Sequence, residues 1–280
     1  MYHSPLCVVA IVLAGSFAAQ AQVGGYPPQG GSTVSTVSAE VVKDLAPKGK
    51  LRAAINLGNM VLAQKVAGTG ELGGVTVDLA QELGRRLAVP VELIAFDAAG
   101  KVFDALKSGA WDVAFLAIEP VRAAEISFTA PYVIIEGVYM VPADSGLLTV
   151  ADVDREGIRI AVNKGSAYDL YLSRTLKHAT LVRGESGADL LVKDKLEAAA
   201  GVKQPLVEFA KANSNVRIIP GRFMEIRQAM GTPKVRLAGR EAAPRYLHAF
   251  VEEMKASGFV AKALERSHQP DAAVAPPATE

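Results

Sequence analysis

Short apolar runs alternate with segments of helical periodicity between residues 39 and 267, and this alternation limits the fold more than any other feature. Residues 77–87, for example, place apolar side chains at the spacing of one helical face. The runs that predict strands are 51–56, 89–96, 111–118, 158–162, 179–183 and 216–219. The segments that predict helices are 77–87, 100–108, 165–176, 206–212 and 244–266. Because strands that alternate with helices form βαβ units, the sequence predicts an α/β protein with mainly parallel sheets, in two sets that divide near Tyr139.

The composition and the charge exclude several classes of protein. Of the 280 residues, 50% are hydrophobic and 21% are charged, which is ordinary for a globular protein and unlike a disordered chain. Lys and Arg number 30 against 29 Asp and Glu, so the net charge of +1 creates no overall field that favours nucleic acid or an anionic membrane. Aromatic residues make up only 6%, which argues against a stacking surface for single strands. We therefore expect no nucleic-acid partner.

The cysteine and histidine content argues against metal sites and thiol chemistry. Cys7 is the only cysteine, so the chain can form no internal disulfide, CxxC redox pair or thiolate zinc cluster. The 4 histidines are all far from one another in the sequence, so the local spacing that is typical of a histidine metal site is missing. We expect no metal.

Gly68, Gly70 and Gly73 match the GxGxxG spelling of a dinucleotide-binding loop, and Glu92 lies near the expected position of its ribose-binding acid. In that motif the glycines follow a buried strand directly and open a helix. Here the predicted helix starts only at about Val77, after a further turn. We therefore expect a glycine-rich loop and no cofactor.

Residues 1–21 have the pattern of a secretory signal peptide. The run 6–19 is apolar and uncharged, is too short to span a bilayer comfortably, and ends in the small-x-small sequence Ala19-Gln20-Ala21. A buried helix is the alternative interpretation. Export of a chain without further cysteines predicts a periplasmic location.

Two more segments are predicted to lie outside the folded body. Residues 22–38 are rich in Gly, Pro, Ser and Thr and carry no charge, which predicts a flexible linker. Residues 268–280 are rich in Ala and Pro, which predicts a disordered tail.

The stretch 111–132 contains the clearest candidate for a site. Its predicted strand reaches Ile118, and a short turn with Glu119 and Arg122 follows. In open α/β sheets ligands bind beyond the carboxyl ends of the strands, where a guanidinium can hold a carboxylate through two hydrogen bonds. The alternative is a surface arginine that pairs with Glu119, three residues earlier.

A series of short motifs runs in a fixed order through the first two thirds of the folded body. The motifs are Gly74-Val75-Thr76-Val77-Asp78-Leu79-Ala80, Asp104-Ala105-Leu106, Gly109, Asp112, Arg122, Phe128-Thr129-Ala130-Pro131-Tyr132 and Lys164-Gly165-Ser166. In order and approximate spacing they resemble the family 3 extracellular solute-binding proteins, the periplasmic receptors of polar amino acid ABC transporters. The match is specific because several motifs occur in the right order.

The resemblance implies a two-lobe fold of the type II periplasmic binding protein class, each lobe a mixed, mostly parallel sheet flanked by helices. Lobe 1 is expected to comprise residues 39–139 plus 228–267, and lobe 2 residues 140–227. The chain is expected to cross between the lobes near 139–142 and to return near 223–230.

The resemblance also implies a site. Arg122 would grip the carboxylate of the ligand, and Gly165 and Ser166 would add donors from a helix amino terminus, where anions are favoured. Arg227 is included because it lies beside the expected return crossing. The full set of expected ligand-binding residues is Arg122, Glu119, Ala117, Ser166, Gly165, Asn56, Lys203, Gln204 and Arg227.

Two departures from the family pattern bear on the ligand. The turn before Arg122 offers Ala117 and Glu119 in place of the usual Ser or Thr. The position of the lobe 2 Asp that pairs with an α-ammonium falls on Val202 or Lys203, and a lysine there would repel an ammonium. Either Glu119 supplies the missing carboxylate, or the ligand is an anion or dicarboxylate. A Lys203 that faces solvent remains the plainer alternative.

The expected function is that of a monomeric periplasmic receptor that captures an amino acid or a related small carboxylate and delivers it to an inner-membrane ABC permease. Such a receptor is not an enzyme. One alternative is a periplasmic enzyme on the same fold, similar to cyclohexadienyl dehydratase, with Glu119 as its general acid. Another is a ligand sensor that signals to a membrane partner.

Overall fold

The computed structural model describes residues 37–237, 239–269 and 272–279. The predicted signal peptide and nearly all of the predicted linker lie outside these residues. No helix within the described ranges is long and apolar enough to cross a membrane.

The first group of elements, lobe 1, is built on a parallel sheet whose central strand is β1. This strand pairs in parallel with β4 on one side and with β5 on the other. The strands are β1 (Leu51–Asn56), β4 (Val91–Phe96) and β5 (Val113–Ala117). The helices are α1 (Ala39–Leu45), α2 (Val75–Leu87), α3 (Ala99–Asp104), α4 (Pro120–Ala123), α8 (Ala242–Ala256) and α9 (Phe259–Arg266).

The second group, lobe 2, repeats the same arrangement. Its central strand β7 pairs in parallel with β8 and β9, and β10 pairs antiparallel with β6. The strands are β7 (Arg159–Asn163), β8 (Thr180–Gly184), β9 (Ala198–Val202) and β10 (Val216–Ile218). The helices are α5 (Ala167–Thr175), α6 (Gly187–Lys193) and α7 (Lys203–Ala212), with a short 3₁₀ turn at Val150–Asp152. A second 3₁₀ turn, Lys234–Leu237, belongs to lobe 1, where the N–H of Lys234 donates to the carbonyl of Glu125.

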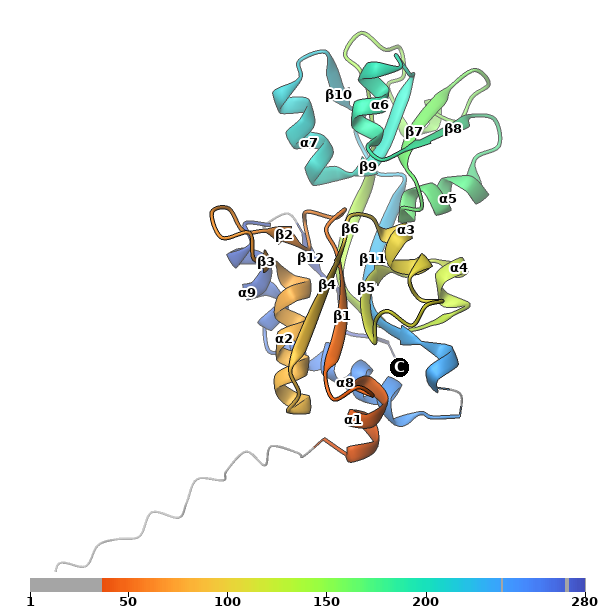
Figure 1. Cartoon of the computed structure of the whole chain (residues 1–280). Helices are drawn as coiled ribbons and strands as arrows, with labels where there is room; N and C mark the ends of the chain where they lie inside the picture. The colour runs from red at the N-terminus through yellow and green to blue at the C-terminus, as the bar shows by residue number, and fades with distance from the viewer. Residues whose placement is uncertain (1–36, 238, 270–271, 280) are drawn as a thin grey trace, which may run out of the picture. The chain divides into compact units, whose positions relative to one another are not determined.

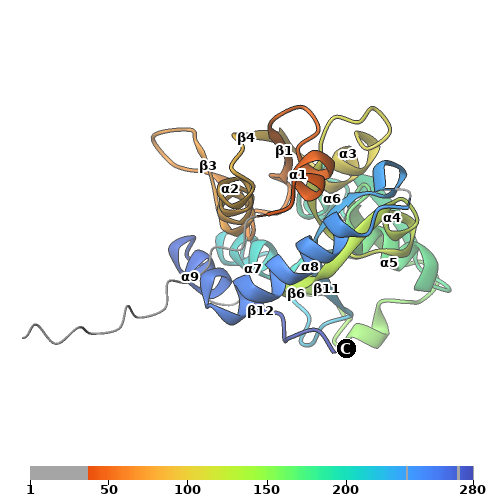
Figure 2. The same cartoon turned by 90° about the horizontal axis from the view of Figure 1, so that it is seen from below.

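Two long antiparallel strands, β6 (Ile126–Pro142) and β11 (Met224–Pro233), continue from one lobe into the other (Figure 1). They join the two sheets in the order β4-β1-β5-β11-β6-β9-β7-β8. Strand β6 pairs with lobe 2 from Gly137 onward, so the outward crossing lies a few residues before the expected 139–142. Helix α8 lies along β6, as the view from below shows (Figure 2).

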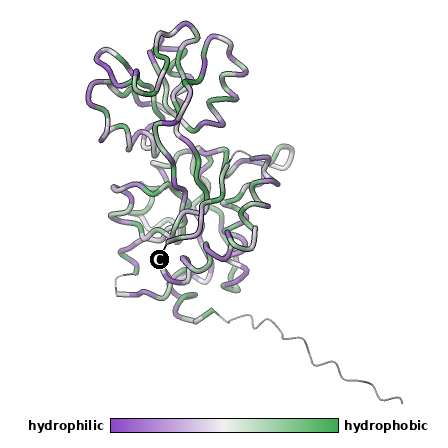
Figure 3. The backbone as a smooth tube through the Cα atoms, turned by 180° about the vertical axis from the view of Figure 1, so that it is seen from behind, coloured by the Kyte–Doolittle hydropathy of each residue, from purple (hydrophilic) through white to green (hydrophobic). Residues whose placement is uncertain are grey.

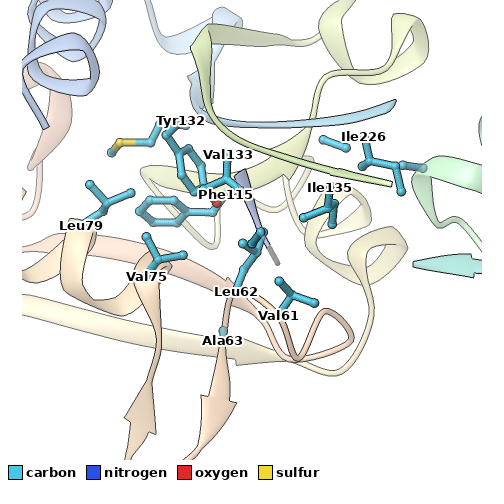
Figure 4. Close-up of a cluster of buried hydrophobic side chains, with 14 of the residues drawn as sticks. Val61, Leu62, Ala63, Val75, Leu79, Phe115, Tyr132, Val133, Ile135 and Ile226 are labelled. Atoms are coloured by element: carbon cyan, nitrogen blue, oxygen red, sulfur yellow. The ribbon is translucent and has the colours of Figure 1, made fainter. Parts of the chain in front are cut away.

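The apolar runs of the sequence form the buried strands and helix faces of the hydrophobic core. The strands in the interior of both lobes are largely hydrophobic (Figure 3). In lobe 1, Phe115 and Tyr132 meet edge to face with ring centroids 6.1 Å apart, surrounded by aliphatic side chains from several elements (Figure 4). Gly84 lets α2 approach β4 closely, because a Cβ at that position would fall 2.1 Å from Cγ2 of Val91.

The glycine-rich segment forms a hairpin loop. Strands β2 (Gln64–Lys65) and β3 (Leu72–Gly73) pair antiparallel, and Gly68 and Gly70 take positive φ angles of 86° and 72° between them. Such φ angles favour glycine. Gly68 and Gly70 therefore serve a hairpin turn and do not lead from a buried strand into a helix, whereas Gly73 ends β3. Helix α2 begins at Val75, just after β3 and two residues before the expected start.

The segment after residue 267 differs from the predicted tail. Strand β12 (Ala273–Val274) pairs antiparallel with β6, and the N–H of Ala275 donates to the carbonyl of Tyr132 at 3.0 Å. Ala275 is buried. The Ala- and Pro-rich composition suggested disorder, but small side chains let this segment pack against a free edge of β6.

Candidate functional site

The carboxyl ends of the parallel strands of both lobes open onto one cavity of about 710 Å³. Residues at or directly after these strand ends line it: Asn56, Asp97, Ala117, Asn163, Gly184 and Val202. Ligands of open α/β sheets bind at such ends, and the volume suits a small molecule.

Arg122 is the buried cation of this cavity. Its side chain lies on α4, directly after β5, and only 1% of its surface is exposed. Nη1 donates to the carbonyl of Ala117 at 3.1 Å and Nη2 to the carbonyl of Gly165 at 2.9 Å. Among the described residues Nε has no hydrogen-bond partner, and no carboxylate lies within ion-pair distance of the guanidinium.

The electrostatics of Arg122 follow from this burial. Loss of hydration lowers the pKa of the guanidinium to about 10, against the opposing effect of the Glu119 charge nearby. The group is still protonated at neutral pH. The site therefore holds a positive charge that two neutral carbonyl groups solvate only in part.

Glu119 does not line the cavity. Its carboxylate is 3% exposed, and Oε2 accepts from Nη1 of Arg174 on α5 at 2.5 Å. The ion pair links lobe 1 to lobe 2 and engages the carboxylate that was expected to serve as ammonium partner or general acid.

The amino terminus of α5 forms the opposite wall. The Ser166 side chain caps the helix by accepting from the N–H of Asp169 at 3.0 Å, and the Asp169 carboxylate accepts from the N–H of Gly165 at 2.8 Å. Gly165 takes φ +70° and lies against Gly100 of lobe 1, where a built Cβ would be 3.0 Å from the Gly100 Cα. The lobes meet here backbone to backbone, and a side chain at Gly165 would make a tight contact with Gly100.

The structure brings together five of the nine residues expected from sequence. Those that line the cavity are Asn56, Ala117, Arg122, Gly165 and Ser166. Those outside its lining are Glu119, Lys203, Gln204 and Arg227.

The position of Lys203 corrects the expectation that a lysine faces the ligand. Strand β9 ends at Val202, which lines the cavity, and the chain turns into α7 at the next residue. The Lys203 ammonium consequently lies 2.8 Å from Glu136 on β6. Arg227 is also directed elsewhere, with Nη2 4.0 Å from the Glu225 carboxylate.

Several polar lining residues were missed from sequence. They include Asp97, Asn163, Asp169, Arg183 and Gln228. The rule that ligands bind beyond strand ends could have identified Asp97 and Asn163, which end or follow β4 and β7. Asp169 and Arg183, which pair at 2.9 Å, carry no local sequence signal.

Comparison with protein-family models identifies the family of this chain. The model of the family "Bacterial extracellular solute-binding proteins, family 3" matches residues 61–269. The comparison with curated protein sequences gave no match.

Solved structures share the fold. The solute receptor for L-cysteine of Neisseria gonorrhoeae has a TM-score of 0.68 and 21% identity, over 82% of this chain and 94% of its own. The amino acid ABC transporter substrate-binding protein AbpA from Streptococcus pneumoniae, bound to L-arginine, has 0.66 and 20%, over 81% and 97%. The ancestral amino acid-binding protein AncCDT-1, a precursor of cyclohexadienyl dehydratase, has 0.65 and 20%, over 80% and 97%. The fold is thus that of the type II periplasmic binding proteins, and the chain belongs to the family 3 bacterial extracellular solute-binding proteins.

Proposed function

We propose that this protein is a periplasmic receptor that captures a small carboxylate-bearing solute in the cavity, with Arg122 as its carboxylate clamp, and delivers it to an inner-membrane ABC permease. One observation carries the proposal. Arg122 is a buried cation whose Nε is unpartnered and which has no carboxylate counterion among the described residues.

A ligand carboxylate would supply what Arg122 lacks. Carbonyl oxygens accept hydrogen bonds but leave the guanidinium charge unneutralised, and a buried charge is costly unless it is paired. A carboxylate can accept two hydrogen bonds from one guanidinium in the same plane. The binding energy would therefore come largely from pairing the buried Arg122 charge with a counterion.

A carboxylate between the lobes would also couple binding to their contact. Arg122 lies in lobe 1, whereas Gly165 and Ser166 lie in lobe 2. A ligand that touches both lobes favours the arrangement in which they meet, and a permease can distinguish this state from an open one.

Thermal unfolding of the purified protein with and without ligands tests the proposal. A screen over amino acids, dicarboxylates and monocarboxylates should yield a hit, since a ligand at ~1,000 times its Kd stabilises the native state by about 4 kcal/mol. Arg122→Ala should abolish the hit. Arg227→Ala removes an exposed arginine outside the cavity and is the matched control.

Two results would contradict the proposal. A hit that survives Arg122→Ala unchanged would remove Arg122 as the clamp. Turnover of prephenate or arogenate by the wild type, lost in Glu119→Gln, would favour the alternative dehydratase function over a receptor.

A further inference from the structure

We infer that the solute is a carboxylate without a neighbouring ammonium group, a net monoanion with an apolar body, and that Val202 sets this choice. The inference rests on the proposed role of Arg122 and adds to it what the rest of the cavity accepts. Three observations carry it: the charge balance around Arg122, the state of the acidic residues in the wall, and the apolar end of β9.

The charged groups around Arg122 leave one positive charge without a carboxylate partner. Three arginines and two carboxylates meet where α4 approaches α5. Arg174 pairs with Glu119 at 2.5 Å and Arg183 pairs with Asp169 at 2.9 Å, which leaves Arg122 without a counterion. A monoanion neutralises this charge. A zwitterion would neutralise it as well but would bring a new positive charge that needs a partner of its own.

Asp169 is the buried carboxylate of the cavity lining, and its oxygens are already engaged. Oδ2 accepts from the N–H of Gly165 at 2.8 Å, and Oδ1 accepts from Nε of Arg183 at 2.9 Å and from Oγ of Ser173 at 3.3 Å. Only 4% of the residue is exposed. An ammonium would have to compete with a guanidinium that already balances this charge.

The remaining acidic residues of the lining are in contact with water. Asp97 is exposed and pairs with Lys101 at 2.7 Å. Asp104 and Glu185 are exposed as well, and so is a further cation of the lining, Lys164. Exposed charges contribute little to binding because water and salt screen them. These exposed carboxylates should therefore bind an ammonium group no more tightly than water hydrates it.

The wall at the end of β9 is apolar. Its lining residues are Ala200, Gly201, Val202, Pro205, Leu206 and Phe209. None of these side chains accepts a hydrogen bond, so an ammonium placed against them would lose its hydration without a replacement. A hydrocarbon body would instead gain from burial there.

Val202 provides a direct way to reverse the selectivity. It occupies the N-cap of α7 with extended backbone angles (φ −67°, ψ 136°), and α7 has no side-chain cap. Aspartate is a preferred N-cap residue, so Val202→Asp should fold while placing a carboxylate at the cavity wall. Val202→Asn has nearly the same size and also caps a helix but carries no charge, and is the matched control.

The experiment compares ligands that share a carbon skeleton. Calorimetric titrations of the wild type, Val202→Asp, Val202→Asn and Arg122→Ala would use 3-phenylpropanoate against L-phenylalanine, 4-methylpentanoate against L-leucine and pentanoate against L-norvaline. We expect a wild-type preference of at least about tenfold for the acid in the pair that binds. Val202→Asp should tighten the amino acid and weaken the acid, and Val202→Asn should not gain the amino acid.

The outcomes separate the two proposals. If the amino acid binds the wild type as tightly as the acid and both are lost in Arg122→Ala, the inference is overturned and the proposed clamp stands. An unchanged preference in folded Val202→Asp would overturn the role of Val202. If no probe binds, or if binding ignores Arg122→Ala, the proposed clamp fails and the inference fails with it.

Discussion

In both lobes an arginine on the central strand binds a carboxylate at the corresponding position of the sheet, and the two pairs differ above all in burial. Arg52 on β1 holds Asp112, and Arg159 on β7 holds Glu197, each through the backbone N–H, Nε and Nη2 of the arginine. Asp112 directly precedes β5, and Glu197 directly precedes β9. The side chains are 8% and 0% exposed in lobe 1 but 45% and 33% exposed in lobe 2.

This difference separates geometry from energetics. In lobe 1 the Asp112 carboxylate also accepts from Arg236, so two cations depend on one fully buried anion. Removing one partner of a buried pair leaves a charge that water cannot reach, whereas water replaces the partner of an exposed pair. The same hydrogen bonds should therefore matter greatly in lobe 1 and little in lobe 2.

Asp112→Asn should produce the largest change. The neutral amide leaves the charges of Arg52 and Arg236 uncompensated, so we expect a loss of about 3–5 kcal/mol in the free energy of unfolding. Urea denaturation followed by circular dichroism measures it. A loss below about 1 kcal/mol would mean that the lobe 1 pair behaves like a surface pair, and the comparison would fail.

The turns before these carboxylates give a second contrast. Gly109 in lobe 1 and Lys195 in lobe 2 both take left-handed backbone angles, with φ of 60° and 49°. A lysine is strained there by roughly 1 kcal/mol relative to glycine. Lys195→Gly should therefore stabilise the protein by about that amount, and Gly109→Ala should destabilise it by a similar amount, since a Cβ at Gly109 meets no atom within 4 Å.

Thermal and urea unfolding of both variants provide the measurement. The two changes act on the same backbone conformation in opposite directions, so each serves as the control of the other. Destabilisation by Lys195→Gly would show that the lysine side chain makes a contribution that outweighs its backbone strain.

The sequence predicted lobe 1 better than lobe 2, for physical reasons. Arg122 could be placed at the cavity because it follows an apolar strand of high β-propensity, and the rule for strand ends is local. Strand β9 reads Ala-Ala-Ala-Gly-Val, residues that strands mostly avoid, and forms because small side chains let β6 and α6 pack closely on it. Without that strand the sequence could not decide whether Val202 or Lys203 lies at the wall, and Lys203 was expected there.

The sequence also contains no sign of the strand pairing between distant segments. The β6 segment contains Pro131, which hides a strand of 17 residues, and nothing in the last residues indicates that Ala273 and Val274 pair with it. The salt bridge between Glu119 and Arg174 joins residues of different lobes and has no signature in spacing. Periodicity thus predicts elements, whereas the contacts between lobes that define the site require the structure.

Glu197→Gln should give the smallest effect and complete the comparison. Hydrogen bonds from Arg159 hold the pKa of the Glu197 carboxyl below its usual value of 4.5. A carboxyl with a lowered folded-state pKa adds stability above its unfolded pKa and loses it as the pH falls through the folded value. The wild type should thus exceed Glu197→Gln by less than about 1 kcal/mol at pH 7, with the difference vanishing at strongly acidic pH. High salt should shrink the pH 7 difference because the pair is exposed, and a salt-insensitive loss as large as that of Asp112→Asn would show that burial is not what distinguishes the lobes.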